Sequence, residues 1–547
     1  MKLNYLTKWL AAGLFTSLLS CGGSSSEPVT PTASCTLGTG TSLNVSGTIT
    51  FERIALLDSG ALDFAGKTSQ PAKAIQVEAI CNSVIAVTTT DVNGSYSVVL
   101  PSGTQGVFIR AKAQMVKSGV PSWNVEIKDA SQAFSLLFAL DSSPFNLDDL
   151  DVTKNLLATA GNVGSTYPVD ALRAAAPFAI LDSIYKSMQL VLSVEPDLIF
   201  PALDVKWSAD NEDGTFYTNN QISVLGSTVD TDEFDEHVIA HEWGHYYQDA
   251  FSRDNSVGGS HTPEDILDIR VAFSEGFGNA LSAMVTGDPV YKDSQGIASG
   301  FFIDVESNNC INEGWYSECS VQSVLYDFFD VANDDIFSLG FDEIHEVMTS
   351  NIPTSSSLTS IFSFINYFKN LASIDATDVD TLLAAQSIDA ISDEYATGVS
   401  DGIYIIGSTD VLPIYDDRAL VDDPPFPLTD VCSTGDNISA AEVYGLGASR
   451  FIRFTAPSSG NFSFTSSWSS GLSTSDPDMY LYSNGDLIGL GVTANNKSET
   501  LVTYLAAGSE YILEVLEYTY VDLDLPYNRS ASGAINKTCF TVSRTSI

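Results

Sequence analysis

Three of the chain's five histidines lie within nine positions, in the segment HVIAHEWGHYYQDAF at residues 237–251. Residues four apart on an α-helix stack on one face, so a helix here points His241 and His245 in the same direction. Two imidazole nitrogens on successive turns can bind one Zn²⁺ at roughly 2.0–2.1 Å each. Glu242 lies about 100° further around the helix, where its carboxylate can reach a water on the metal without binding the metal itself. The spacing therefore predicts a zinc centre with a carboxylate base.

This arrangement is the HExxH pattern of zinc metallopeptidases, with His241, Glu242 and His245 in its fixed positions. A metzincin would have a glycine three residues and a histidine six residues after the second histidine. Gln248 and Phe251 stand at those positions, which excludes that class.

A catalytic zinc site needs a third protein ligand. In the apolar, helical segment RVAFSEGFGNALSAM, Glu275 directly precedes a glycine. This segment resembles the second helix of the gluzincins, the thermolysin-like and aminopeptidase-like clan, in which a glutamate is the third ligand. The resemblance implies that His241, His245 and Glu275 bind zinc and that Glu242 is the general base.

The sequence between His245 and Glu275 is longer than is usual in gluzincins, because it spans residues 246–274. A polar stretch, SRDNSVGGSH, predicts a long loop there. Thr262 and Pro263 follow it and predict the start of a helix, as cap and first residue. The loop also holds rival third ligands: His261, Glu264, Asp265 and Asp268.

Other residues in and before the predicted helix at 237–251, called the metal helix below, also bear on its structure. Asp230 and Glu233 predict a capping box at its start. Gly244 costs a helix about 1 kcal/mol relative to alanine, which a close approach by another backbone or by substrate would explain. His237, one turn before His241, is either a partner of the metal ligands or a helix-surface histidine.

Zinc-activated water gives hydrolysis of a polarised carbonyl, with Glu242 taking the proton. Such a reaction needs a donor that stabilises the oxyanion, usually a tyrosine or histidine. Tyr316 is the preferred candidate, with Tyr326 and His261 as alternatives. The leading interpretation is a zinc metallopeptidase that cleaves protein or peptide substrates. Two alternatives are a non-catalytic binding or adhesion lipoprotein, which would have no need of Glu242, and a zinc hydrolase of a non-peptide ester or amide.

The first residues predict export. Two lysines precede the apolar run WLAAGLFTSLL, which is a signal peptide over residues 1–20 rather than a spanning helix. The stretch LLSC resembles a bacterial lipobox, which implies that Cys21 is lipidated and that residues 21–41 are a flexible tether. The expected location is the outer membrane, facing the periplasm or the cell surface. The alternative is a secreted protein that uses Cys21 in a disulfide.

Six cysteines remain when Cys21 is set aside. Many pairings are possible, but pairing of neighbours keeps each bond within one proposed region, and an exported protein can keep disulfides. The expected disulfides are Cys35 with Cys81, Cys310 with Cys319, and Cys432 with Cys539.

The expected fold class is multidomain, with a central α+β zincin-like metallopeptidase domain at residues 131–415 flanked by two β-sandwiches. Residues 42–130 alternate in short runs around the turn DVNG and resemble carboxypeptidase regulatory-like or transthyretin-like modules. Residues 430–547 resemble the bacterial pre-peptidase C-terminal domain in the segments DPDMYLY and AAGSEYILEV. The strand QISVLG at 221–226 is expected at a sheet edge that pairs with extended substrate, or else in the core.

The formal net charge of −45 excludes electrostatic attraction to nucleic acid or anionic lipid as a general function. Membrane attachment is therefore expected through the lipid anchor alone. The acidic runs NLDDLD and ADNEDG offer oxygen ligands for Ca²⁺, although solvated loops are the default interpretation. No apolar span long enough for a membrane helix follows the signal peptide.

Overall fold

The computed structural model describes residues 34–131, 136–306, 309–330, 337–400, 411–418, 428–435, 444–494, 497–521 and 537–547. The signal peptide, Cys21 and the first part of the tether lie outside these ranges. Within them, none of the helices combines the length and the hydropathy needed to cross a membrane.

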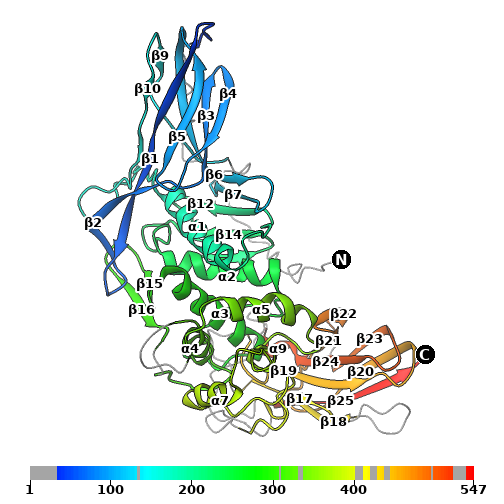
Figure 1. Cartoon of the computed structure of the whole chain (residues 1–547). Coiled ribbons are helices and arrows are strands. Elements are labelled where there is room, and N and C mark those ends of the chain that lie inside the picture. Colours follow the sequence, from blue (N-terminus) through cyan, green and yellow to red (C-terminus); the bar gives the residue numbers. More distant parts are fainter. Residues whose placement is uncertain are drawn as a thin grey trace, which may run out of the picture.

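Two sheets face each other in the N-terminal part (Figure 1). In the first, β1 pairs with two antiparallel and two parallel neighbours. Its strands are β1 (Ser42–Leu56), β2 (Leu62–Pro71), β5 (Ser95–Pro101), β10 (Val152–Thr153) and β11 (Leu156–Ala158). Alternate residues of β1, such as Val45, Ile49 and Phe51, are fully buried, as expected for a sheet with one face on a core.

The second sheet has the order β13, β14, β12, β7, β6, β3, β4, with β8 and β9 also pairing to β6. Its strands are β3 (Ile75–Cys81), β4 (Ser83–Thr89), β6 (Thr104–Lys117), β7 (Trp123–Asp129), β8 (Ala139–Asp141), β9 (Phe145–Leu147), β12 (Leu203–Trp207), β13 (Phe216–Thr218) and β14 (Gln221–Val224). The sheet runs across residue 130, because β7 pairs in parallel with β12. The boundary expected there falls between two strands of one sheet.

The QISV strand is not at the edge of this sheet. β14 pairs with β12 on one side and with β13 on the other, so both of its backbone edges are bonded. The expectation of an edge strand at 221–226 is therefore wrong, and the outer position is taken by β13, which the sequence pattern did not separate from the loop before it.

Helices pack below this sheet in Figure 1. They are α1 (Ala176–Val194), α2 (Glu236–Phe251), α3 (Ile269–Thr286), α4 (Glu318–Phe329), α5 (Asp342–Glu346), α6 (Ile361–Phe368) and α7 (Ala376–Ala385), with π and 3₁₀ turns η1 (Val347–Asn351) and η2 (Ile352–Thr354). Helix α2 contacts α1 and α3, and α3 contacts α4. A hairpin of β15 (Val290–Ser294) and β16 (Gly300–Asp304) follows α3. Trp243 and Tyr247 of α2 and Phe277 of α3 are fully buried at these contacts.

Two expected helix starts are wrong. Helix α2 begins at Glu236, and Glu233 does not cap it, because its buried carboxylate accepts from Arg173 Nη1 at 2.6 Å. Helix α3 begins at Ile269, where the Asp268 side chain accepts from the backbone N–H of Arg270. The TPED segment before it forms a single turn.

The C-terminal part is a sandwich of two antiparallel layers, with a parallel strand at one edge. One layer has the order β17 (Tyr415–Asp416), β19 (Ser449–Thr455), β24 (Glu510–Glu517), β21 (Pro477–Ser483), β22 (Asp486–Gly491). The other has the order β18 (Leu428–Thr434), β25 (Lys537–Ser546), β20 (Gly460–Ser470), β23 (Ser498–Leu505), and a short α9 (Tyr518–Val521) follows β24. Phe462, Leu513 and Phe540 are fully buried between the layers.

Buried ionic contacts attach this sandwich to the helices. The Arg270 guanidinium, fully buried on α3, donates to both carboxylate oxygens of Glu514 on β24 at 2.8 and 2.9 Å. The same guanidinium also donates to Asp268. Arg253, just after α2, donates to the backbone carbonyl of Asn484 in the turn between β21 and β22.

Three disulfides join the pairs that the sequence predicts. Cys35 is bonded to Cys81, Cys310 to Cys319, and Cys432 to Cys539.

Candidate metal centre

Helices α2 and α3 bring three candidate ligands together. The Nε2 atoms of His241 and His245 lie 3.1 Å apart, and Oε2 of Glu275 lies 3.1 Å from the first and 3.4 Å from the second. One ligand atom from each residue therefore falls within 4.8 Å of the others. Two nitrogens and one carboxylate oxygen are the donor set of a three-ligand zinc site.

The outward-facing ring nitrogens of both histidines are engaged elsewhere. His241 Nδ1 lies 2.8 Å from Oδ1 of Asn279, whose amide N–H donates in turn to Gln322. His245 Nδ1 lies 3.2 Å from the hydroxyl of Ser274. An imidazole that donates from Nδ1 to an amide oxygen keeps the lone pair of Nε2 for a metal. The contact between His241 and Asn279 thus fits the metal-binding tautomer of that ring.

Asn279 was missed from the sequence, although a signal existed. It lies four residues after Glu275 on the same helix, so the rule that paired the two histidines also places these two side chains on one face. Gln322, by contrast, comes from α4 and could be found only through the tertiary fold.

Glycines allow α2 and α3 to approach closely. A Cβ on Gly244 would stand 3.2 Å from the Cα of Gly278, and a Cβ on Gly278 would stand 2.9 Å from the ring of His241. The glycine inside the metal helix is thus explained by a close backbone approach, one of the two reasons expected.

His261 also reaches the cluster. Its Nε2 lies 3.5 Å from Oε2 of Glu275 and 3.1 Å from Oε2 of Glu318, in the first turn of α4. Its Nδ1 lies 3.0 Å from the carbonyl of Gly259. These three contacts fix the ring beside the candidate metal ligands, at the tip of the loop between the two helices.

The cluster is electrostatically coupled. Burial alone would raise the pKa of Glu275, but the charges of His245 and His261 and a hydrogen bond from His241 hold it well below its usual range. Burial opposes the charged form of the two histidines, yet Glu275 raises the pKa of His245 to about 9 and, with Glu318, that of His261 to about 10. Without metal, the raised pKa values favour protonated histidines beside the negative charge of Glu275. A metal ion must displace the protons from the nitrogens that it binds.

Glu242 points into the same environment. It is 9 % exposed, and its charge acts on both His245 and Tyr291. Tyr291 belongs to β15, and its ring lies 6.3 Å from that of His241. Among the described residues, the Glu242 carboxylate has no hydrogen-bond or ion-pair partner, so its oxygens are free to accept a proton.

The structure gives the remaining candidates other surroundings. Tyr316 is 2 % exposed, and its hydroxyl donates to the backbone carbonyl of Glu313 at 2.9 Å. Burial, with Asp330 adding to it, raises the pKa of Tyr326 to about 12.

The rivals in the loop also have other partners. Asp268 caps α3 and binds Arg270. Asp265 accepts from the N–H of Thr262, and Glu264 is exposed.

His237 takes a structural position. It is 6 % exposed, and its Nε2 lies 3.0 Å from both the carbonyl of Asp288 and the hydroxyl of Thr286, at the end of α3. Burial lowers its pKa. The ring therefore joins the start of α2 to the end of α3.

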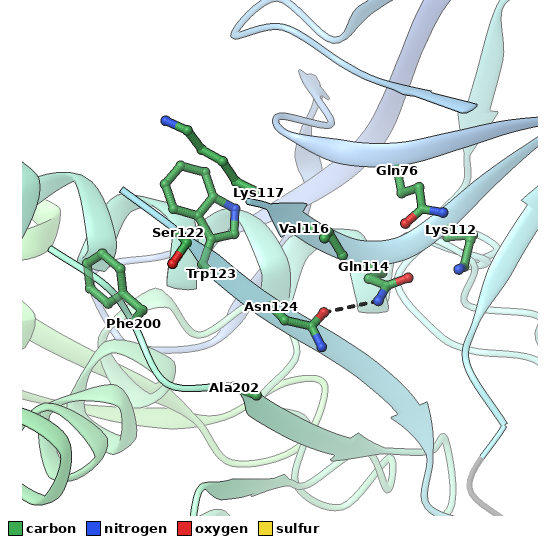
Figure 2. A pocket seen from close by; sticks show the side chains of 10 residues that line it. All are labelled: Gln76, Lys112, Gln114, Val116, Lys117, Ser122, Trp123, Asn124, Phe200 and Ala202. Atoms are coloured by element: carbon green, nitrogen blue, oxygen red, sulfur yellow. Dashed lines mark hydrogen bonds between the residues drawn. The ribbon is translucent and has the colours of Figure 1, made fainter. Parts of the chain in front are cut away.

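A surface hollow of about 540 Å³ lies elsewhere, over β3, β6 and β7 (Figure 2). Trp123, with the ammonium of Lys117 4.8 Å from its ring, forms one side. Gln114, which donates to Asn124, lies toward the other side. None of its lining residues is a candidate metal ligand.

Comparison with known proteins identifies the segment that carries the cluster. Residues 199–388, which include α2, α3 and α4, match the family model of the Mycolysin C-terminal domain. A search of curated proteins finds no match.

Two solved structures show only distant likeness. The pre-peptidase C-terminal domain of collagenase from Bacillus anthracis is 14% identical, over 24% of this chain and 99% of that chain, with a TM-score of 0.14. A cycloisomaltooligosaccharide glucanotransferase from Paenibacillus sp. is 10% identical, over 91% and 72%, with a TM-score of 0.12. At these TM-scores, neither likeness bears on the fold of this chain.

Proposed function

We propose that the chain is a zinc metallopeptidase of gluzincin type that hydrolyses peptide bonds in an exported location. The observation that carries this proposal is the convergence of His241, His245 and Glu275, with the charge of Glu242 acting on His245. The match of residues 199–388 to a peptidase-related profile supports it independently.

Bound Zn²⁺ would supply an acidified water and a polarised substrate carbonyl. In the reaction, Glu242 accepts a proton at its carboxylate and returns it to the leaving amine. Its burial keeps that carboxylate away from bulk water, and within the described ranges no ion pair or hydrogen bond competes for its oxygens. Asn279 and Ser274 hold the two imidazole rings in place during both transfers.

His261 is a better donor to the oxyanion than Tyr316. Its Nε2 lies 3.5 Å from Oε2 of Glu275, at the edge of the cluster, and Glu318 favours the protonated form, whose Nε2–H must turn from Glu318 to the oxyanion in the reaction. The Tyr316 hydroxyl donates to the backbone carbonyl of Glu313. We therefore propose His261 for this role.

Membrane attachment through a lipid at Cys21 is part of the proposal, supported by the lipobox-like stretch LLSC. Cys21→Ser should move the protein from the membrane fraction to the soluble fraction. Retention of the variant in the membrane would mean that another segment attaches the protein.

Four variants test the catalytic proposal, with bound zinc measured by elemental analysis and turnover measured on a peptide library. Glu242→Gln keeps the size of the side chain and should retain zinc while losing hydrolysis by several orders of magnitude. Glu275→Ala should lose zinc as well. His261→Ala should keep zinc but lower kcat more than it raises KM. The matched control is Glu264→Gln, an exposed loop acid, which should behave as the parent.

Other outcomes separate the alternatives. Full activity in Glu242→Gln would contradict the mechanism, and unchanged zinc affinity in Glu275→Ala would move the third ligand into the loop. A parent chain that binds zinc but hydrolyses no peptide would favour a binding lipoprotein or a hydrolase of another ester or amide.

A further inference from the structure

Another group of possible metal ligands, which shares no residue with the candidate zinc ligands, lies at the start of α2. Asp230 and Asp232 come from the segment that leads into α2, and Asp293 comes from β15. One carboxylate oxygen from each lies within 4.8 Å of the others. Asp235 adjoins them, because the charges of Asp232 and Asp293 act on its carboxylate.

Backbone contacts hold the two segments together. The N–H of Ser294 donates to Oδ2 of Asp235 at 2.7 Å, and the hydroxyl of Ser294 donates to the carbonyl of Thr231 at 2.8 Å. Two residues after Ser294, the backbone of Gly296 also lies close to the other segment, because a Cβ there would stand 3.1 Å from the carbonyl of Val229. The position of the acids is therefore fixed by the fold and does not depend on flexible side chains alone.

Several oxygens of this cluster are buried without a partner. Asp232 is 3 % exposed and Asp235 is 0 % exposed, and Oδ1 of each has no hydrogen bond. Asp230 Oδ1 is also buried without a hydrogen bond. The other oxygen of Asp232 accepts from the hydroxyl of Thr215. Burying an anionic oxygen without a partner is strongly unfavourable, so these carboxyl groups need either protons or a positive charge beside them.

No side chain in the described ranges supplies that charge. None of the ion pairs there involves any of the four aspartates. Two cations come near the cluster through its neighbours in sequence. Arg173 pairs with Glu233, next to Asp232, and Lys292, next to Asp293, pairs with Asp288. The nearby cations are thus committed to other acids.

We propose that Asp230, Asp232 and Asp293 bind a Ca²⁺ ion, with Asp235 beside them. The donors are all oxygens, the set that Ca²⁺ prefers, whereas zinc favours nitrogen and sulfur. Ca²⁺ accepts oxygens at about 2.3–2.6 Å, so two oxygens bound to one ion lie at most about 5 Å apart, and oxygens within 4.8 Å of one another meet that limit. Asp230 and Asp293 are half-buried and give the ion a path from solvent. Water would complete its coordination.

The ion would join the chain that enters α2 to the strand that follows α3. Both helices carry candidate zinc ligands, so bound Ca²⁺ fixes their connections on one side. The acidic runs NLDDLD and ADNEDG, in contrast, contribute to none of the metal-binding groups found in the described part of the chain. Binding at this cluster does not depend on the proposed hydrolysis.

Calcium binding by the full-length exported protein tests this proposal. The protein is freed of Ca²⁺ on a chelating resin, its zinc content is checked before and after, and CaCl₂ is added in a calorimeter and in thermal unfolding experiments. We expect one Ca²⁺ per chain and a rise in the unfolding temperature. Asp232→Asn and Asp293→Asn should each weaken binding at least tenfold, while the exposed control Asp170→Asn should bind as the parent does.

The effect of Asp232→Asn on the unfolding temperature should have opposite signs without and with Ca²⁺. In calcium-free buffer at pH 8, Asp232→Asn removes one of several crowded carboxylates and should unfold at a higher temperature than the parent. With saturating Ca²⁺ it should unfold at a lower one. The proposal is overturned if the parent shows no heat of binding and no change in unfolding temperature, or if MgCl₂ gives the same affinity and shift as CaCl₂. If Asp232→Asn does not fold, the half-buried Asp293→Asn decides alone.

Discussion

Adding one methyl group at Gly278 should weaken zinc binding at the candidate centre. The Cβ of Gly278→Ala would stand 2.9 Å from Cε1 and Nδ1 of His241, about 0.5 Å short of the 3.4 Å at which ordinary contacts begin. The ring is also held from that side by Asn279. It can therefore relieve the clash only by giving up this hydrogen bond or by moving away from its present position.

The distance by which the His241 ring moves determines how much zinc affinity is lost. Metal–ligand distances tolerate deviations of about 0.2 Å, so a ring displaced by about 0.5 Å is a poor ligand. Disturbing the groups that orient a ligating histidine weakens metal binding by about 10–100-fold, or about 1.4–2.7 kcal/mol. Alanine has the opposite effect on the helix itself, since it is favoured over glycine by about 1 kcal/mol. Zinc affinity should therefore fall without a comparable loss of stability in the metal-free protein.

Competition with a zinc-sensitive dye measures the affinity, and urea unfolding with and without zinc measures the stability. Gly244→Ala is the matched control, because its Cβ would stand 3.2 Å from the Cα of Gly278 and 3.3 Å from Leu281, without touching a ligand. It should require a slight separation of α2 and α3 but bind zinc within a few-fold of the parent. Gly278→Ala with parental zinc affinity and increased stability would refute the reasoning.

Two further predictions concern other parts of the molecule. Arg270→Leu leaves the buried carboxylates of Asp268 and Glu514 without their cation and should cost about 3–5 kcal/mol in urea unfolding. Burial and the charge of Asp230 raise the pKa of Asp293 to about 7, so the folded, calcium-free chain binds this proton more tightly than the unfolded chain. The stability that this proton provides is complete below about pH 4 and is lost as the pH rises through about 7. Asp293→Asn should therefore flatten the fall in urea midpoint between pH 5 and pH 8.

The residues that could be predicted from sequence are those whose geometry is local. The spacing of His241 and His245 within one helix determines that they share a face, and the structure places both beside Glu275. The three disulfides also followed from sequence order, because each pair lies within one structural region.

Residues whose roles depend on distant partners could not be predicted. Glu233 has the spacing of a capping residue, but a buried arginine from a segment 60 residues earlier takes its carboxylate. Glu318 meets His261 only because α4 packs on α3, and no local pattern encodes that contact. The QISV strand was expected at an edge, or else in the core, because it precedes the helix with the two histidines, and its outer neighbour β13, only three residues long, gave no strand pattern of its own.

The sheet that runs across residue 130 affects how the molecule can be divided. A fragment that begins at residue 131 would lose β7 and leave unpaired those backbone N–H and C=O groups of β12 that face β7, although β14 would still pair with the other edge. Leu203, Val205 and Trp207 of β12 are buried. An exposed apolar edge of this kind pairs readily with a strand from another copy. The isolated fragment should therefore aggregate, and in the whole chain the N-terminal strands protect it against self-association.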